Sequence, residues 1–274
     1  MSRTTLASES IEPLLRVSGL SKSFGGVQAL KNVDLKVFPG EVHGLVGANG
    51  AGKSTLIKIL SGAIAKDAGE IYLEGRRLAI HGPQDAHRLG LSFIHQELSL
   101  VPKFSIIENL TLGLRKRTHL GLIDWKATQK SAAAVVERMG LKHPLDTPVE
   151  ALSVAEQWLV VIAHALMRKI KLISMDEPTA SLSSDEAERL FKVIRDLTGE
   201  GVSVLYVSHR LDEILTLCDG ISVFKDGMCV LTTDRKSATK TTLVDAIVGG
   251  RVDESHHTPV SGIDGRPVVL RVEN

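Results

Sequence analysis

The chain has 274 residues, 43% of them hydrophobic and 24% charged, and its formal net charge at pH 7 is +1. This length and composition allow a full hydrophobic core, and we expect one large domain that carries insertions. The near-neutral charge, without a basic block, lacks the electrostatic footprint of nucleic-acid binding, so no nucleic-acid partner is expected. Two cysteines, Cys218 and Cys229, are too few for a disulfide framework, and no segment approaches the roughly 20 apolar residues that span a bilayer. We therefore expect a cytosolic chain that contacts a membrane only through other chains.

Along the chain, short strand-like runs alternate with longer segments of helical periodicity. This alternation predicts an α/β fold around a largely parallel sheet. The expected strands of that sheet are residues 41–47, 91–95, 171–175, 202–209 and 220–227. The expected helices are residues 53–62, 125–140, 157–169 and 185–199.

Two regions depart from this alternation. The composition of residues 14–20, 30–38 and 69–80 is typical of antiparallel strands and hairpins, which predicts a β subdomain beside the main sheet. Between about residues 97 and 158, helical segments dominate and no strand is expected. This stretch is predicted to be a helical subdomain inserted into the α/β core, and residues 1–13 are predicted to be an N-terminal tail.

The end of the chain carries a repeat of its beginning. The segment Leu14-Leu15-Arg16-Val17 returns as Val269-Leu270-Arg271-Val272. Residues 251–267, which precede the returning segment, are rich in Gly, Pro, Ser and His, as is typical of a linker. We expect a second copy of the domain to begin at residues 268–274, so that the chain stops just past the junction; a chance match of four residues is the alternative.

The strongest motif is GANGAGKST, which satisfies G-x-x-x-x-G-K-[ST] between an apolar strand-like run and a helix. Its glycines let successive backbone N–H groups point at phosphate oxygens, and the helix N-terminus adds positive dipole. The lysine reaches the β- and γ-phosphates, and the serine hydroxyl ligates Mg²⁺. An ordinary glycine-rich turn is the alternative, which the strand and helix on either side disfavour. The predicted nucleotide-binding residues are Gly47, Ala48, Asn49, Gly50, Ala51, Gly52, Lys53, Ser54 and Thr55.

A second candidate site lies where an apolar strand-like run ends in Asp176 and Glu177. The sequence Asp-Glu-Pro is by itself a common signal for a turn and a helix start. Following a P-loop by about 120 residues, the pair is better interpreted as a metal ligand and a catalytic carboxylate. Asp176 is then near the Mg²⁺, and Glu177 orients or deprotonates an attacking water.

Residues 151–158, ALSVAEQW, allow two interpretations. Ser153 and Glu156 have the spacing of a capping box, in which each side chain satisfies an N–H group of the first helical turn. The same stretch is also a candidate for an altered loop that touches the terminal phosphate of a nucleotide.

Five motifs follow one another in the order GANGAGKST, FIHQEL, ALSVAEQ, ISMDEPTA and YVSHRLDE. This order resembles the ATP-binding cassette of ABC transporters. Further details are similar to the first of two fused cassettes in the ATPases of bacterial simple-sugar importers, and the likeness covers roughly residues 14–250. It implies a P-loop NTPase core, ATP and Mg²⁺ as cofactors, and a second cassette after the returning LLRV-like segment.

The resemblance also assigns roles outside the P-loop. Phe24 corresponds to an aromatic residue that stacks on adenine, and Gln96 to a glutamine that senses Mg²⁺ and water. His209 corresponds to a histidine that contacts the γ-phosphate. The alternatives are a core aromatic, a polar loop residue and a hydrogen-bonded core histidine. The positions of all three in the motif order favour the functional interpretation.

Two segments depart from the pattern of the family. The signature loop is usually LSGGQ, whereas both glycine positions are occupied here by Val154 and Ala155. A later loop usually carries an aspartate, which is replaced by Ser183. Both changes are expected to weaken the surface offered to a second cassette. At the signature loop, we expect the Ala155 methyl to hold the γ-phosphate of the opposite site away from the backbone. Ser153 and Ala155 are nevertheless the signature residues predicted to approach that phosphate.

The resemblance implies an ATPase that powers import of a small solute, in particular a monosaccharide. Its implied partners are a second cassette, membrane permease subunits and, indirectly, a periplasmic sugar-binding protein. The chain is then peripheral on the inner face of the cell membrane. Residues 97–113 and the helical insertion are predicted to dock a permease helix, or their apolar side chains are internal core. The alternative functions are a soluble ABC ATPase without transport and an ATP-sensing module with weak turnover.

Overall fold

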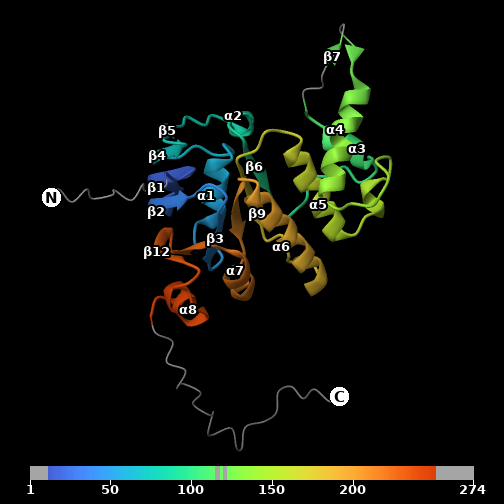
Figure 1. Ribbon diagram of the computed structural model, residues 1–274. Helices are drawn as coiled ribbons and strands as arrows, with labels where there is room; N and C mark the ends of the chain where they lie inside the picture. Colours follow the sequence, from blue (N-terminus) through green and yellow to red (C-terminus); the bar gives the residue numbers. More distant parts are fainter. Residues whose placement is uncertain (1–11, 115–117, 120–121, 251–274) are drawn as a thin grey trace, which may run out of the picture.

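The computed structural model describes residues 12–114, 118–119 and 122–250. Its main sheet has six strands in the order β12-β11-β3-β10-β9-β6 (Figure 1). The strands from β11 to β6 run parallel, and β12 pairs antiparallel with β11, so the predicted α/β fold is confirmed. The bounds are β3 Val42–Gly47, β6 Leu91–Ile94, β9 Leu172–Asp176, β10 Ser203–Val207, β11 Gly220–Lys225 and β12 Met228–Asp234.

A second, antiparallel sheet of four strands has the order β2-β1-β4-β5 and confirms the predicted β subdomain. The β1–β2 connection consists of Gly25 and Gly26, whose φ angles of 51° and 89° suit a tight hairpin connection. The strands are β1 Leu15–Phe24, β2 Val27–Val37, β4 Ala68–Leu73 and β5 Arg76–Arg77.

The main sheet separates two hydrophobic clusters, as alternate residues of β10 illustrate. Leu205 and Val207 belong to the cluster formed with α1 (Lys53–Leu60) and the antiparallel sheet. Val204 and Tyr206 belong to the cluster formed with α5 (Val154–Leu166), α6 (Ser184–Gly199) and α7 (Leu211–Leu217). Strands covered on both faces read as continuous apolar runs, which is why the sequence indicated them clearly.

Helices α3 (Ile106–Thr111) and α4 (Trp125–Arg138) pack with α5 at the end of the molecule away from the antiparallel sheet (Figure 1). This group forms the predicted helical subdomain. The expectation that this stretch contains no strand is wrong, because β7 (Thr118–His119) pairs with β8 (Leu122–Ile123). Strands of two residues are too short to leave a periodic signal in the sequence. The other helices are α2 (Pro83–Arg88), α8 (Lys240–Val248) and the 3₁₀ turn Val149–Ala151.

Within the described residues, the structure contains no helix with the length and apolarity needed to cross a membrane.

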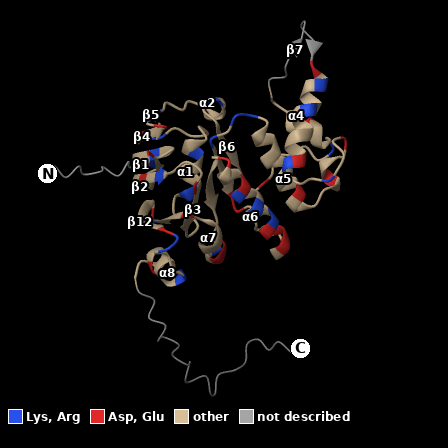
Figure 2. Cartoon of the chain, in the orientation of Figure 1, with Lys and Arg blue, Asp and Glu red and all other residues tan. Residues whose placement is uncertain are grey.

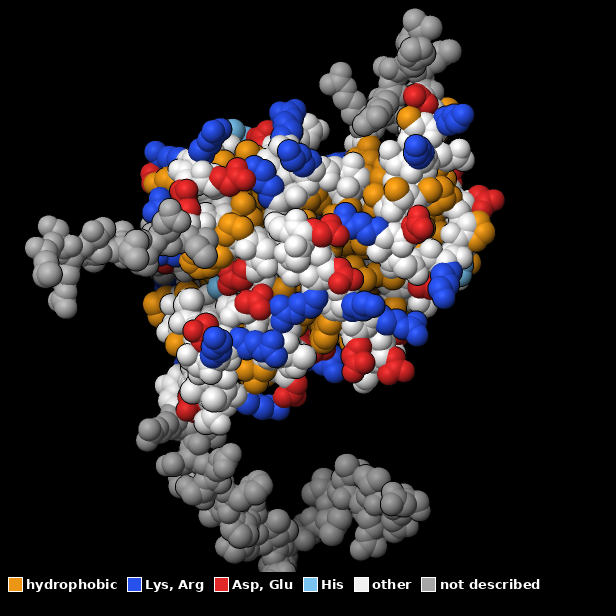
Figure 3. Space-filling view, viewed as in Figure 1, with side chains coloured by type: hydrophobic (Ala, Val, Ile, Leu, Met, Phe, Trp, Pro, Cys, Tyr) orange, Lys and Arg blue, Asp and Glu red, His pale blue; other side chains and the backbone are white. Residues whose placement is uncertain are grey.

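Acidic and basic side chains both occur along α6 (Figure 2). They also lie next to each other over the face of the molecule in Figure 3. The predicted linker 251–267 and the returning segment at 268–274 lie outside the described residues.

Candidate nucleotide-binding site

The predicted P-loop connects β3 to α1, so its strand–loop–helix context is confirmed. Gly47 and Gly52 have φ angles of 150° and 107°, which L side chains rarely adopt. A Cβ atom on Gly47 would lie 2.2 Å from the carbonyl oxygen of Phe224, and one on Gly52 would lie 2.8 Å from that of Ala29. Neighbouring backbone therefore requires both glycines, independently of any phosphate.

Lys53 is buried at the start of α1. Its Nζ donates hydrogen bonds to the carbonyl oxygens of Gly47, at 2.7 Å, and Ala48, at 3.0 Å. Burial lowers the pKa of Lys53, and the negative charges of Glu177 and Asp176 oppose that shift. The amine is thus held against the loop and within the field of both predicted carboxylates.

One cavity brings together most of the predicted nucleotide-binding residues. It is formed by the P-loop, by Gln96 just after β6, and by the two carboxylates at the end of β9. These segments are far apart in the sequence and meet because their parallel strands end at the same edge of the sheet. The lining residues are Asn49, Gly50, Ala51, Gly52, Lys53, Ser54, Thr55, Gln96, Asp176 and Glu177.

The donor set of this cavity fits Mg²⁺. The hydroxyl of Ser54, the amide oxygen of Gln96 and the carboxylate of Asp176 are hard oxygen donors, which this ion prefers. Among the residues that the structure describes, no cluster of three or more His, Cys, Asp or Glu side chains could hold a metal. Because Mg²⁺ binds proteins through a few oxygen donors and takes its other ligands from phosphate and water, the donor set of Ser54, Gln96 and Asp176 suits this ion.

Asp176 ends β9, and the parallel register places it beside Val207 of β10. Burial raises the pKa of Asp176, and the nearby His95 and Lys53 oppose that shift. Glu177 follows with a φ of 50°, which is uncommon for a residue other than glycine, and its N–H donates to the carbonyl oxygen of Val207 at 2.9 Å. Left-handed backbone of this kind is concentrated at functional sites.

His209 follows β10 and contacts Glu177. The Nδ1 atom of His209 lies 2.8 Å from Oε2 of Glu177, and the His209 backbone N–H donates to Oε1 at 3.1 Å. The imidazole side chain is 67% exposed, whereas the carboxylate side chain is only 17% exposed. The His209 ring nitrogen therefore lies next to a carboxylate that has little contact with bulk water.

Phe24 lies at the end of β1 and is 48% exposed. The Nζ atom of Lys22 lies 5.3 Å from the centre of its ring, within the range of a cation–π contact. Phe24 does not line the cavity described above. Its exposure agrees with a stacking surface and rules out the alternative of a core aromatic, while its contact with adenine stays a prediction.

The segment 151–158 forms the predicted capping box. Ser153 Oγ accepts from the N–H of Glu156 at 3.3 Å, and the Glu156 carboxylate accepts from the N–H of Ser153 at 2.9 Å. Val154 is 43% exposed on the first turn of α5. Ser153 and Ala155 do not line the P-loop cavity, and their predicted contact with the nucleotide of a second cassette remains a prediction.

Ser183, the second departure from the family pattern, caps α6 in the same way. Its Oγ accepts from the N–H of Glu186 at 3.4 Å, and the Glu186 carboxylate accepts from the N–H of Ser183 at 2.9 Å. The S-x-x-E spacing of residues 183–186 is the sequence signal for this capping box. At both altered loops the serine therefore has a local structural role.

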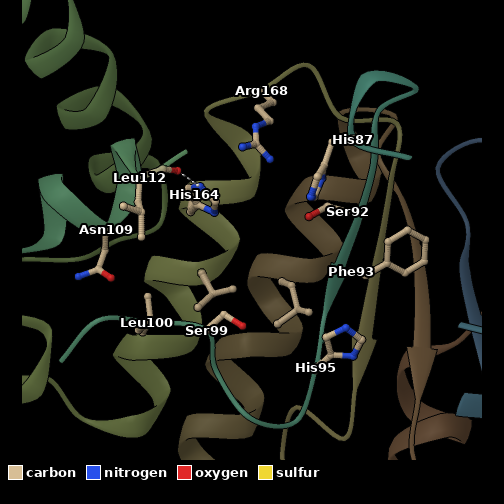
Figure 4. Close-up of a pocket in the computed structure, with 12 residues that line it drawn as sticks. His87, Ser92, Phe93, His95, Ser99, Leu100, Asn109, Leu112, His164 and Arg168 are labelled. Atoms are coloured by element: carbon tan, nitrogen blue, oxygen red, sulfur yellow. Dashed lines mark hydrogen bonds between the residues drawn. The ribbon is translucent and has the colours of Figure 1, made fainter. Parts of the chain in front are cut away.

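A second cavity is lined by His95, the residue before Gln96 (Figure 4). It lies between β6, the following loop and helices α3 and α5. Nε2 of His164 is 3.1 Å from the carbonyl oxygen of Leu112, and Arg168 donates to the carbonyl oxygen of Gly113 at 3.3 Å. Burial lowers the pKa of His164, and the charge of Arg168 adds to that shift. The loop after Gln96 and the helix that starts at the altered signature thus line the same cavity.

A buried polar cluster around Glu213 was not predicted. It consists of a carboxylate on α7 and hydroxyl groups from three other segments, and only the sequence SHRLDE hinted at an acidic residue there. No local pattern connects residues that are 34 positions apart, as Thr179 and Glu213 are. The cluster members are Thr179, Tyr206, Ser208 and Glu213.

This fold and cavity define a nucleotide-binding protein of the P-loop NTPase class. A family model described as ABC transporter matches residues 30–180, which is more than half of the 274 residues. The chain therefore belongs to the ABC transporter family.

Relatives and solved structures agree with this assignment. The chain is 42% identical over 264 residues to the ribose import ATP-binding protein RbsA of Caldanaerobacter subterraneus subsp. tengcongensis, a match that covers 96% of this chain and 53% of that protein. It is 46% identical over 259 residues to the ribose import ATP-binding protein RbsA 1 of Burkholderia cenocepacia, covering 92% and 50%. The chain thus spans about half the length of the curated relatives it matches.

Among solved structures, the chain is similar to an ATP-binding cassette of an ABC transporter in its ADP conformation, with a TM-score of 0.77 and 26% identity over 87% of this chain and 99% of that one. It is also similar to a nucleotide-free ATP-binding cassette, with a TM-score of 0.72 and 28% identity over 81% and 92%. Both confirm the expected fold class.

Proposed function

We propose that this chain is the ATP-hydrolysing part of an importer that moves a monosaccharide through a membrane permease. The observation that carries the proposal is the convergence of Lys53, Asp176 and Glu177 on one cavity, with His209 in contact with Glu177. The sugar class is carried over from relatives that are named for ribose import.

In this proposal the P-loop binds the phosphates of ATP through backbone N–H groups, and Lys53 moves from its loop carbonyls to the β- and γ-phosphates. Ser54, Gln96 and Asp176 would hold Mg²⁺, which when bound neutralises charge on the phosphate oxygens. Phe24 stacks on the adenine ring, as its exposed position permits.

Glu177 orients a water molecule for attack on the γ-phosphate and accepts its proton. Its side chain is mostly shielded from bulk solvent and lies in contact with His209. The backbone N–H of His209 donates to that carboxylate, and Nδ1 lies 2.8 Å from its other oxygen. We expect the imidazole to turn toward the γ-phosphate when ATP is bound.

The proposed organisation is an N-terminal tail at 1–13, a cassette at 14–250 with its helical subdomain at about 97–158, a linker at 251–267 and the start of a second cassette at 268–274. The second cassette, or a second copy of this chain, completes each nucleotide site with its signature loop. Ser153 and Ala155 are the residues that this chain contributes in return. The assembly lies on the inner face of the cell membrane, and a periplasmic sugar-binding protein delivers the sugar to the permease.

The cavity of Figure 4 is the proposed seat for a helix of the permease. It touches the segment after Gln96 on one side and α5 on the other, so a helix seated there can sense both the site and the signature loop. The apolar side chains of Leu100 and Leu112 and the polar lining beside them suit an amphipathic segment.

The function is tested by reconstituting the complete protein with its permease in proteoliposomes. ATP-dependent uptake of radiolabelled ribose supports sugar import, and uptake should disappear with Glu177→Gln. Hydrolysis without uptake of any monosaccharide would point to a soluble ATPase, and ATP binding without turnover would point to a sensor.

A further inference from the structure

Glu213, on α7, is a buried carboxylate with an unusual number of hydroxyl partners. Its side chain is 8% exposed. Oε2 of Glu213 accepts hydrogen bonds from Thr179 Oγ1 at 2.6 Å, from the Tyr206 hydroxyl at 2.9 Å and from Ser208 Oγ at 3.3 Å. All three donors are fully buried, so no water competes for these bonds.

The three donors belong to the segments that carry the predicted catalytic pair. Thr179 lies two residues after Glu177, and Ser208 directly precedes His209. Tyr206 lies in β10, the strand that leads to His209. A single carboxylate oxygen thus ties the loop after β9 to the loop after β10.

The other oxygen of Glu213 forms an ion pair with an arginine of the same region. Nη1 of Arg210 lies 2.6 Å from Oε1, and the Arg210 backbone N–H donates to Ser208 Oγ at 3.0 Å. Burial raises the pKa of Tyr206, and the negative charge of Glu213 adds to that shift, so the phenol stays protonated and remains a donor. His209 therefore sits between two residues, Ser208 and Arg210, that are both anchored to Glu213.

We propose that Glu213 is a positioning residue for hydrolysis: it sets the distance between the Glu177 carboxylate and the His209 imidazole by fixing the residues next to them. This inference rests on the proposed roles of Glu177 and His209. Neither Glu213 nor its three donors lines the P-loop cavity, so the effect is exerted through backbone placement and not by contact with ATP. A displacement of about 1 Å at a reacting group can cost roughly a hundredfold in rate.

The test compares single-turnover hydrolysis of radiolabelled ATP, affinity for a fluorescent ATP analogue, and Tm. Glu213→Ala should slow hydrolysis by about tenfold to a hundredfold while ATP affinity changes by less than about twofold. Glu213→Gln keeps one acceptor oxygen and should be intermediate. Thr179→Val removes the hydroxyl at constant shape and should be slow, whereas Thr179→Ser keeps the donor and should hydrolyse near the wild-type rate.

Ser222→Ala is the matched structural control. Ser222 is fully buried and its Oγ lies 2.9 Å from Nε2 of His43, apart from the hydrogen bonds that join Glu213 to Thr179, Tyr206 and Ser208. This variant should lower Tm without slowing hydrolysis. The proposal is overturned if Glu213→Ala and Thr179→Val hydrolyse normally, if Thr179→Ser is as slow as Thr179→Val, or if Ser222→Ala is slowed in proportion to its loss of Tm.

Glu177→Gln distinguishes a failure of the positioning role of Glu213 from a failure of the proposed role of Glu177. If this variant is inactive while the Glu213 and Thr179 variants are normal, only the positioning role is lost. If Glu177→Gln itself hydrolyses at the wild-type rate, the proposed function of Glu177 is wrong, and the role given to Glu213 is wrong with it.

Discussion

Nδ1 of His209 lies 2.8 Å from Oε2 of Glu177, although the two residues are 32 positions apart. The contact exists because β9 and β10 are adjacent parallel strands, with Asp176 in register with Val207. Each strand therefore delivers its following residues to the same edge of the sheet. The carboxylate and the imidazole meet there beside the P-loop cavity, where hydrolysis is proposed to occur.

Lys53→Ala should weaken ATP binding by about tenfold to a hundredfold, because charge-assisted hydrogen bonds to phosphate are worth roughly 1.5–3 kcal/mol. Titration with a fluorescent ATP analogue measures this change. Lys58→Ala, on an exposed position of the same helix, is the control and should bind ATP as the wild type does. Unchanged affinity in the Lys53 variant would contradict the P-loop assignment.

Glu177→Gln should retain ATP affinity and lose turnover by roughly a hundredfold or more, the usual contribution of a general base. The amide oxygen can still accept from the His209 N–H, so the backbone should stay in place. Binding and steady-state hydrolysis are measured on the same preparation. Turnover at the wild-type rate would exclude the proposed role of this carboxylate.

Restoring glycine at Val154 and Ala155 should raise the ATPase activity of this chain alone by about tenfold to a hundredfold, since it returns close backbone donors to the γ-phosphate of the opposite site. We predict an asymmetric arrangement in the complete protein, in which the second cassette has a better signature that faces this P-loop and an altered P-loop lysine that faces this signature. The same change in the complete two-cassette protein should therefore do little, because there the altered signature faces the defective site.

The double glycine variant also carries a cost in helix stability of up to about 1 kcal/mol per residue. Replacing Ala133 and Ala134 of α4 by glycine is the matched control, since both are exposed helical positions outside the signature loop. No gain in activity for the Val154 and Ala155 variant, or an equal gain in the control, would reject the asymmetric arrangement. The segment 151–158 would then be only a helix cap.

The α6 capping box should make stability depend on pH. Hydrogen bonds from the backbone and side chain of Ser183 lower the pKa of Glu186 below its ordinary value of 4.5. A carboxylate with a lowered folded-state pKa stabilises the fold above its unfolded pKa, and this contribution is lost as the pH falls through the folded pKa. The difference in free energy of unfolding between wild type and Glu186→Gln should thus be largest above about pH 5 and shrink below 4.5.

Urea unfolding at several pH values measures that difference. Glu188→Gln, on an exposed position of α6 outside the capping box, should show no comparable trend. A difference between wild type and Glu186→Gln that stays constant from pH 7 to pH 3.5 would show that the box does not stabilise the folded chain through the Glu186 charge.

Features that are built from adjacent residues can be predicted from local sequence. The P-loop is one of these, because a single run from Gly47 to Thr55 supplies its backbone donors, its lysine and its hydroxyl. The capping box at Ser153, which was predicted, is another, since it needs only two side chains three positions apart. The box at Ser183 has the same spacing but was not predicted. The alternation of strands and helices predicted the α/β fold for the same local reason.

Tertiary structure alone decided which strands are neighbours, and with that the geometry of the site. The contact of Glu177 with His209 depends on the pairing of β9 with β10, which no local pattern encodes. The left-handed φ of Glu177 and the three hydroxyl groups around Glu213 likewise depend on tertiary packing and not on a local sequence pattern. Such features are paid for by the packing of the whole domain, because burying a carboxylate or straining a backbone angle is unfavourable until many distant contacts compensate for it.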